Sequence, residues 1–285
     1  MRLLIFILII LTKPLLAQDN EGDEFKFASY LIDNESYEEA SFVLKKILAE
    51  SEDTRALDSA HFMLGQIYFS QKLLEEAVVH YDKVSNGSIP LSTQSLFYST
   101  LSSSYLGKYS TAALKLKNYN STDTSLYNLK NLSLAAVSLL DRNFKSYDSL
   151  SLLLDKENYL IGVQAEDLNF HKKKLIAVSK KSGLKAGVLS ALIPGAGRMY
   201  VEKPGQGIYQ LIIATILGLQ TWESYRKDGV ESARFIIYGS LFTSFYIGNI
   251  WGSTIGVKLY KNEIKETVDN AILLDMHIPL RTLFR

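Results

Sequence analysis

The chain has 285 residues, a hydrophobic share of 47% and 31 basic against 30 acidic side chains. This length allows two domains. The formal net charge of +1 excludes the broad cationic surface that nucleic-acid backbones require, so we expect no nucleic acid among its partners. The absence of cysteine excludes disulfides, thiolate metal sites, a cysteine nucleophile and a lipid-modified N-terminal cysteine.

The N-terminus has the order of a secretory signal peptide. Arg2 precedes an apolar run over residues 3–11, and the small residue Ala17 offers a cleavage site before Gln18. This run is shorter than the ~20 apolar residues that a membrane span needs, which favours cleavage over a retained anchor. We therefore predict a signal peptide over 1–17 and export of the remaining chain to the cell envelope.

A period of about 35 residues runs through the following part of the chain. Four stretches superpose without a gap: FASYLIDNESYEEASFVLKKI from Phe27, LGQIYFSQKLLEEAVVHYDKV from Leu64, STLSSSYLGKYSTAALKLKNY from Ser99 and LAAVSLLDRNFKSYDSLSLLL from Leu134. Their second position holds Ala28, Gly65, Thr100 and Ala135. A bulky residue follows nine positions later, at Tyr37, Leu74, Tyr109 and Phe144. Three positions further on stand Ala40, Ala77, Ala112 and Tyr147.

This pattern resembles the tetratricopeptide repeat, in which paired antiparallel helices cross at small residues and successive pairs stack into a solenoid. The fourth stretch departs from the family pattern, because Tyr147 stands where a small residue is expected. We predict an all-α protein with a helical-repeat solenoid of about four helix pairs over 18–158, and an irregular helical bundle is the alternative. The second stretch matches the family best, through Leu64, Gly65, Tyr68, Ala77, Tyr81 and Val84.

In the resembled family the first helix of each pair carries peptide ligands on a concave face, so the resemblance implies such a groove here. The groove lacks the lysine and asparagine pattern that holds a terminal carboxylate, and we expect an apolar peptide or helix as its ligand. The alternative is that its side chains pack against the next helix or against the C-terminal part of the chain. The candidate groove residues are Phe62, Gln66, Phe69, Gln94, Phe97 and Leu101.

The C-terminal third changes in character. Lysines gather in a predicted amphipathic linker helix over 159–185, where they face either anionic lipid or water. Two uncharged stretches follow at 205–222 and 235–257. Because both lack the charged stripe of a surface helix, we predict a membrane domain over 186–261 with a transmembrane helical hairpin, rather than a buried pair of soluble helices. The remaining residues, 262–285, form an amphipathic tail that docks on the repeats or on lipid.

Small residues recur at every fourth position of the second uncharged stretch. In lipid such a ridge lets helix backbones approach closely. We expect it to face Ala214 and Gly218 of the first stretch, with homo-oligomerisation through the same ridge as the alternative. The predicted helix-packing ridge consists of Ser240, Ser244, Gly248, Gly252 and Gly256.

The hairpin is preceded by the stretch PGAGRMYVEKPGQGIYQ. This resembles the Pro-Gly-x-Gly-x-x-Tyr turn of small bacterial membrane domains, over roughly 185–261, and that resemblance implies an architecture but no activity. Val201, Glu202 and Lys203 depart from the small residue and glycine usual after the tyrosine. Residues 186–201 are expected to be re-entrant or interfacial, with a third span as the alternative. The predicted membrane turn comprises Pro194, Gly195, Gly197, Tyr200, Gly205 and Gly207.

No sequence pattern points to catalysis. Gly195 and Gly197 begin a dinucleotide-binding fingerprint, but Tyr200 occupies the third glycine position. We therefore predict no enzyme activity, no catalytic residue, no cofactor and no metal. The histidines have no partner at metal-binding helical spacing, and they are His61, His80, His171 and His277.

These patterns together favour a non-enzymatic, membrane-anchored helical-repeat adaptor or scaffold in a bacterial cell envelope. Its repeats would be exported to the periplasm, its anchor would lie in the inner rather than the outer membrane, and its partners would be another envelope protein and membrane lipid. The alternative hypothesis makes the hairpin the working part, as an oligomerising or lipid-contacting membrane module that the repeats regulate.

Overall fold

Every regular element in the described part of the chain is an α-helix, which confirms the predicted all-α class. The structure is a computed structural model that describes residues 22–85 and 89–284. The predicted signal peptide at 1–17 therefore lies outside the described residues. The chain divides into two compact units, which we call the repeat unit (residues 1–168 and 272–285) and the hairpin unit (169–271).

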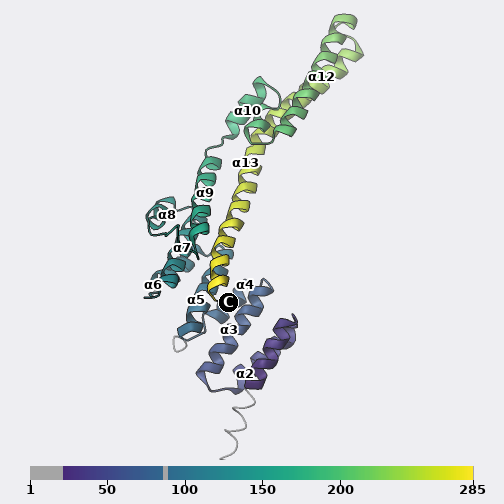
Figure 1. The fold of residues 1–285 in the computed structure, drawn as a ribbon. Helices are drawn as coiled ribbons and strands as arrows, with labels where there is room; N and C mark the ends of the chain where they lie inside the picture. Colours follow the sequence, from purple (N-terminus) through teal and green to yellow (C-terminus); the bar gives the residue numbers. More distant parts are fainter. Residues whose placement is uncertain (1–21, 86–88, 285) are drawn as a thin grey trace, which may run out of the picture. The chain divides into compact units, whose positions relative to one another are not determined.

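The repeat unit consists mainly of helices in consecutive antiparallel pairs (Figure 1). Each helix from α2 to α8 packs against the next one in the sequence, and α3 also contacts α5. Aspartate caps begin α3 and α7: the Asp53 side chain accepts from the backbone N–H of Arg55, and Asp123 accepts from two N–H groups. The helices cover residues 22–33, α2 Tyr37–Glu50, α3 Thr54–Ser70, α4 Leu74–Tyr81, α5 Ile89–Tyr105, α6 Tyr109–Asn118, α7 Thr124–Leu140 and α8 Phe144–Ser151.

The turns inside the four pairs share one backbone conformation. In each turn one residue has a positive φ of 58° to 72°, and it lies two positions before the second helix begins. The backbone N–H of the next residue donates to the carbonyl five positions earlier, as in Ser36 to Leu31 and Leu73 to Tyr68. This pattern is a Schellman motif, which satisfies carbonyls at the end of the first helix. The positive-φ residues are Glu35, Lys72, Gly107 and Arg142.

The small residues at the second position of each repeat are buried at the crossings of paired helices. A methyl group on Gly65 would lie 2.6 Å from ring carbons of Tyr81, so only a residue without a side chain allows this approach. Tyr147 is fully buried in α8 at the position where the other repeats have alanine, and burial raises the pKa of its hydroxyl to about 12.

The hairpin unit contains the remaining helices (Figure 1). Helices α12 and α13 run side by side, with Gly218 against Phe242 and Thr221 against Gly239. The tail predicted at 262–285 is not a separate element, because α13 continues without a break from the hairpin, and its last part belongs to the repeat unit. The helices are α9 Gly162–Ser179, whose first residues belong to the repeat unit, α10 Gly183–Leu192, α11 Ala196–Tyr200, α12 Pro204–Asp228 and α13 Ala233–Leu283.

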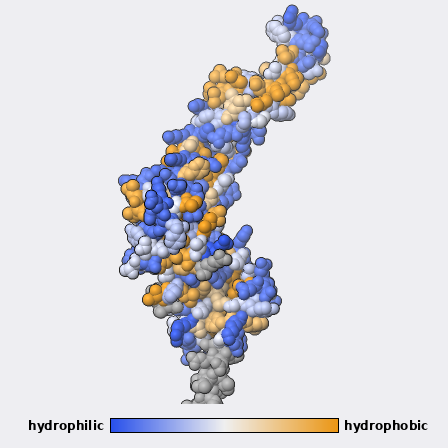
Figure 2. Space-filling view, in the orientation of Figure 1, coloured by the Kyte–Doolittle hydropathy of each residue, from blue (hydrophilic) through white to orange (hydrophobic). Residues whose placement is uncertain are grey.

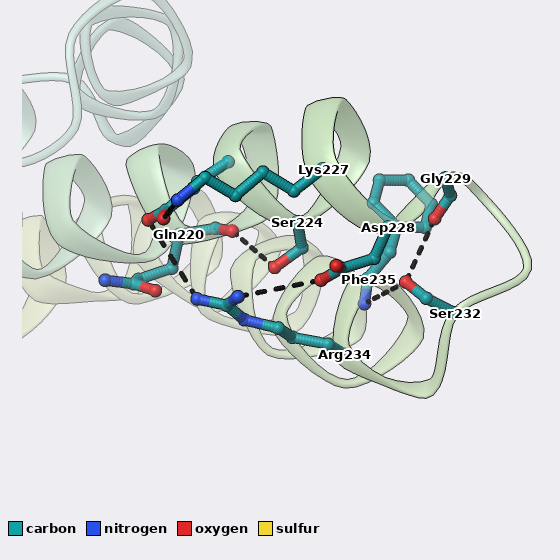
Figure 3. A network of polar contacts seen from close by, with 9 residues as sticks. Gln220, Ser224, Lys227, Asp228, Gly229, Ser232, Arg234 and Phe235 are labelled. Atoms are coloured by element: carbon teal, nitrogen blue, oxygen red, sulfur yellow. Dashed lines mark hydrogen bonds and ion pairs between the residues drawn. The ribbon is translucent and has the colours of Figure 1, made fainter.

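The tip between α12 and α13 is held by polar contacts (Figure 3). The guanidinium of Arg234 lies 3.9 Å from a carboxylate oxygen of Glu223 and 3.6 Å from one of Asp228. Gly229 ends α12 with a φ of 79°. The Ser232 hydroxyl donates to the Gly229 carbonyl and accepts from the backbone N–H of Phe235, which caps the start of α13. The segment between the two uncharged stretches is thus a charged, closed turn.

None of the helices within residues 22–85 and 89–284 combines the length and the apolarity that crossing a bilayer requires. The two spans predicted at 205–222 and 235–257 are therefore not supported. The prediction equated lack of charge with apolarity, but glutamine side chains within 205–222 lower its hydropathy as strongly as charged side chains would. These are Gln206, Gln210 and Gln220.

Candidate functional site

The chain's own C-terminal helix segment, residues 272–284, which we call the tail segment, belongs to the repeat unit and contacts two of the predicted groove residues. The ring of His277 meets the ring of Phe69 edge-on, with centroids 5.7 Å apart, and the ring of Phe284 lies 6.1 Å from that of Phe97. One face of the tail segment is buried, through Ile272, Leu273, Met276 and Leu280. An amphipathic helix thus occupies the place predicted for a ligand helix.

Two of the candidate groove residues, Phe69 and Phe97, contact the tail segment. Phe62, Phe97 and Leu101 are buried, while Phe69 and the two glutamines are half-buried. Phe69 also meets Tyr98 and Tyr105 edge-on. These contacts agree with the alternative in which the groove side chains pack within the protein. The glutamines are Gln66 and Gln94.

A cavity of about 530 Å³ remains open beside the tail segment. Burial, and then the positive charge of Arg281, lower the pKa of the His277 imidazole, so it is neutral at physiological pH and packs as an aromatic ring. The cavity has no carboxylate in its lining, which consists of Phe69, Ser70, Lys72, Leu74, Tyr105 and His277.

The Pro-Gly turn is built around a buried polar cluster between α10, α11 and α13. The Ser190 hydroxyl donates to the Ser253 hydroxyl at 2.7 Å and accepts from the backbone N–H of Gly197 at 2.9 Å. The Asn249 side chain accepts from the N–H of Gly195 at 3.3 Å and donates to the Ser190 carbonyl at 3.4 Å. The motif therefore joins the short helices to α13 by hydrogen bonds that have no competing water.

Three of the turn glycines are required by close backbone approach. A methyl group on Gly207 would lie 2.6 Å from the carbonyl oxygen of Gly195. Gly195 has a φ of +85°, and a methyl group there would lie 2.0 Å from the carbonyl oxygen of Gly207. A methyl group on Gly197 would lie 2.3 Å from the carbonyl oxygen of Ala186. Gly205, in contrast, has nothing within 4 Å of such a position, so its role in the predicted turn has no steric basis in the structure.

Tyr200 lies at the lysine-rich end of the hairpin unit. Its hydroxyl accepts from the backbone N–H of Ser182 at 3.2 Å, and its ring is approached by the amines of Lys181 at 4.7 Å and Lys185 at 5.3 Å. These cation–π contacts hold two positive charges against an aromatic ring. Pro194, the first residue of the predicted turn, is half-buried between α10 and α11.

The helix-packing ridge does not form one continuous contact with α12. Gly252 and Gly256 face the side chain of Arg198 in α11, and Gly248 has nothing within 4 Å of a built methyl group. Gly218 of α12 receives Phe242 rather than a ridge residue. The other two ridge residues, Ser240 and Ser244, line a shallow surface hollow.

The structure brings together two histidines that sequence reasoning left apart. The Nδ1 atoms of His61 in α3 and His80 in α4 lie 3.0 Å apart, so one ring donates and the other accepts. Burial, followed by the charges of His61, Lys83 and Lys45, lowers the pKa of His80 to about 4. The pKa of His61 is also lowered, mainly by burial. A search within one helix could not find this pair, because its spacing of 19 residues crosses a turn.

Helices α10, α12 and α13 expose large apolar side chains over much of the hairpin unit (Figure 2). In α12 the only buried residues are Gly207, Ala214 and Ser224, all of them small. The exposed side chains include Leu184, Val188 and Leu192 of α10, Ile208, Ile212, Ile216, Leu219 and Trp222 of α12, and Ile237, Leu241, Ile247, Trp251 and Ile255 of α13. We call this set the apolar surface of the hairpin unit.

In residues 22–85 and 89–284 no three His, Asp or Glu side chains are placed to hold a metal ion. In the repeat unit the tail segment contacts Phe69 and Phe97, and the hairpin unit presents a polar cluster beside an exposed apolar surface. Comparison of the chain with protein-family models, curated proteins and solved structures gives no match.

Proposed function

We propose that this is a non-enzymatic helical-repeat protein that attaches to a lipid bilayer through its hairpin unit. One observation carries the proposal: α12 buries only three small residues, while its large apolar side chains point outward. Contiguous exposed apolar patches mark contact sites for lipid or protein, because apolar surface in water is unfavourable. We favour lipid over a protein partner because α12 and α13 both expose apolar side chains on their outward faces. A single flat protein surface could not cover both of these faces.

The charges around the apolar surface support the same proposal. Charged side chains lie at the hairpin tip, where Arg234 pairs with Glu223 and Asp228, and at the opposite end, where Lys181 and Lys185 flank Tyr200. Charged groups at the ends of an apolar zone can stay in water or among head groups while the zone contacts acyl chains. The proposal requires contact with lipid and does not depend on either helix crossing the bilayer.

A second candidate function is the adaptor, in which tetratricopeptide-like repeats recruit another envelope protein on the exported side of an inner membrane. The aromatic floor of the groove favours it, because Phe69 and Phe97 already hold an amphipathic helix. An external helix would have to displace the tail segment. Removing residues 272–285 should then increase binding of a partner peptide, and unchanged binding would exclude the groove as its site.

The chain's only two tryptophans test lipid attachment directly, because Trp222 and Trp251 are both exposed on the apolar surface. We expect their emission to shift to shorter wavelength when the full chain meets phospholipid vesicles, and lipids brominated on the acyl chain to quench it. Single Trp222→Phe and Trp251→Phe variants assign the signal to each helix. Emission unchanged by vesicles, with the protein left behind when the vesicles float, would reject the proposal.

A further inference from the structure

The side chain of Arg198 lies over a part of α13 that has no side chains. A methyl group on Gly256 would lie 2.7 Å from Nη1 and 3.2 Å from Cζ of Arg198, and one on Gly252 would lie 3.3 Å from Nη2. The guanidinium therefore rests on the α13 backbone at these two glycines. We call this arrangement the arginine seat. Glycine at 252 and 256 leaves room for this position of the guanidinium, whereas Gly248 has open space.

The guanidinium in the arginine seat has no partner within the described part of the chain. Its Nε is buried and makes no hydrogen bond. The nearby acidic side chains of the turn are already used: Glu202 pairs with Lys181, and Glu263 pairs with Lys203 at 2.7 Å. The buried hydroxyls of Ser190 and Ser253 bond to each other. The terminal nitrogens Nη1 and Nη2 are not among the buried atoms, so an external anion would reach the guanidinium through them.

The surroundings of the arginine seat indicate which anion. Leu192, Ile193 and Met199 are exposed on the adjoining part of α10 and α11. Lys185, exposed beside Tyr200, and Lys258, exposed two residues after Gly256, add positive charge and are paired with no carboxylate in the described residues. A phosphate beside acyl chains has the matching chemistry, because a planar guanidinium binds phosphate through two parallel hydrogen bonds.

We propose that the arginine seat binds the head-group phosphate of a phospholipid, with Arg198 as the ligand and Gly252 and Gly256 as the surface that positions it. This inference rests on the proposed lipid attachment and adds the group that is recognised. Apolar contact alone would not distinguish lipid classes. Arg198 would make binding depend on the phosphate, beyond the diffuse attraction of the lysines.

The test measures binding of the full chain to two kinds of vesicle by flotation. One kind is phosphatidylglycerol mixed with phosphatidylcholine, and the other is digalactosyl diacylglycerol, which forms bilayers without phosphate. Arg198→Gln removes the ligand, and Gly256→Ala keeps the charge but pushes the guanidinium out of its seat. Two controls are matched to these: Gly248→Ala on the same ridge and Lys258→Gln for an equal loss of charge nearby. Circular dichroism checks that each variant is folded.

We expect Arg198→Gln and Gly256→Ala each to weaken binding to the phospholipid vesicles by about tenfold or more, because charge-assisted hydrogen bonds to the phosphate are lost. Lys258→Gln should weaken it by about fivefold at most, through the loss of diffuse attraction, and Gly248→Ala should leave it unchanged. All variants should bind the phosphate-free vesicles alike. Equal weakening by Lys258→Gln and Arg198→Gln would overturn the site in favour of diffuse charge. Unaltered binding of Arg198→Gln to phospholipid would also overturn it, while leaving lipid attachment intact.

Two further outcomes distinguish a failure of lipid attachment from a wrong assignment of the ligand of the arginine seat. If the unaltered chain floats with neither kind of vesicle, lipid attachment itself fails, and the head-group site fails with it. If millimolar inorganic phosphate raises the thermal stability of the unaltered chain but not of Arg198→Gln, while both bind phospholipid vesicles equally, the seat takes free phosphate and the lipid assignment is wrong.

Discussion

Helix α7 of the repeat unit and helix α12 of the hairpin unit differ in the side chains that they bury: α7 buries several leucines, whereas α12 buries only Gly207, Ala214 and Ser224. Leu64, Ile67 and Leu132 of the repeat unit are fully buried, as expected of a protein core in water. In the hairpin unit the buried positions include Asn249 and Ser253, which hydrogen-bond around the Pro-Gly turn, while leucines, isoleucines and tryptophans point outward. This difference is what the proposed lipid attachment of the hairpin unit predicts, because apolar side chains that contact acyl chains need no burial within the protein.

Small residues also serve different purposes in the two units. Gly65 lets a helix pass directly against the ring of Tyr81, and Ala40, Ala77 and Ala112 are buried at equivalent helix crossings. Gly252 and Gly256 instead make room for the guanidinium of Arg198. These three helical glycines mark close approach, and the neighbouring side chain tells whether the approach is apolar packing or the placement of a charge.

The largest effect should come from breaking the contact between the tail segment and the groove. Replacing Ile272 and Leu280 together by alanine removes two fully buried side chains, and we expect a loss of about 4–8 kcal/mol in the free energy of unfolding of the repeat unit. Leu274 and Ile278 lie on the exposed side of the same segment. Their double alanine variant should cost less than about 1 kcal/mol. Denaturant unfolding followed by circular dichroism measures both, and equal losses would show that the tail segment is not part of the repeat unit.

A matched pair of leucines sharpens the comparison of the two units. Leu132→Ala in α7 should cost about 2–5 kcal/mol, because the side chain is fully buried. Leu219→Ala in α12 should cost less than about 1 kcal/mol, since its side chain is 63% exposed. The same Leu219→Ala variant should bind vesicles more weakly. A large stability loss from Leu219→Ala without lipid would mean that α12 has a conventional core.

A glycine-to-alanine substitution should lower the free energy of unfolding at Gly65 in the repeat unit but not at Gly248 in the hairpin unit. Gly65→Ala forces the buried Tyr81 ring to move, and we expect a loss of about 1–3 kcal/mol. Gly248→Ala meets no neighbour and improves helix propensity, so it should be neutral or stabilise α13 by up to about 1 kcal/mol. Thermal unfolding of the two variants tests this, and the prediction fails if Gly65→Ala is as stable as the unaltered chain.

The smallest effect concerns pH and only the repeat unit. The pKa of His80 is lowered to about 4, so the unfolded chain takes up a proton near pH 6.5 that the folded chain binds only near pH 4. The neutral His80 therefore makes its full contribution to the free energy of unfolding above pH 6.5, and this contribution is lost as the pH falls towards 4. We expect about 1–2 kcal/mol, less than the full shift implies because the pair is half-exposed and screened by solvent.

A His80→Phe variant keeps an aromatic ring beside Tyr68 and removes the titrating group. Its stability should change less between pH 7 and pH 5 than that of the unaltered chain, as measured by denaturant unfolding at each pH. Lys72→Gln, in the turn before α4, serves as a control in which one charge is lost without a histidine. Parallel pH profiles for the His80→Phe variant and the unaltered chain would argue against the histidine pair.

Local sequence patterns located the helices of the repeat unit well. The bulky residues picked out by the period, Tyr37, Leu74, Tyr109 and Phe144, are the first residues of α2, α4, α6 and α8. Such positions can be predicted because caps, turns and helical periodicity act over a few residues. Hydropathy over 205–222 was a weaker guide, because an uncharged stretch with three glutamines can form a long helix without being apolar enough to cross a bilayer.

The sites required the tertiary structure. The pairing of Phe97 with Phe284 joins residues almost at opposite ends of the described chain, and Arg198 meets Gly256 only because α11 folds back on α13. Periodicity within one helix cannot predict these contacts, because they join residues that are far apart in the sequence. The open alternative for the tail, lipid or repeats, was likewise decided by packing, since an amphipathic helix suits either environment.

Backbone sterics and local hydrogen bonding act over a few residues, so the sequence sufficed to predict the helical class of the described residues, the starts of the paired helices and the positions that hold small residues. The contact of the tail segment with Phe69 and Phe97, the pairing of two histidines and the position of Arg198 on the glycines of α13 emerged only from the fold. Those outcomes depend on which distant surfaces fit each other, and shape complementarity is a property of the folded chain.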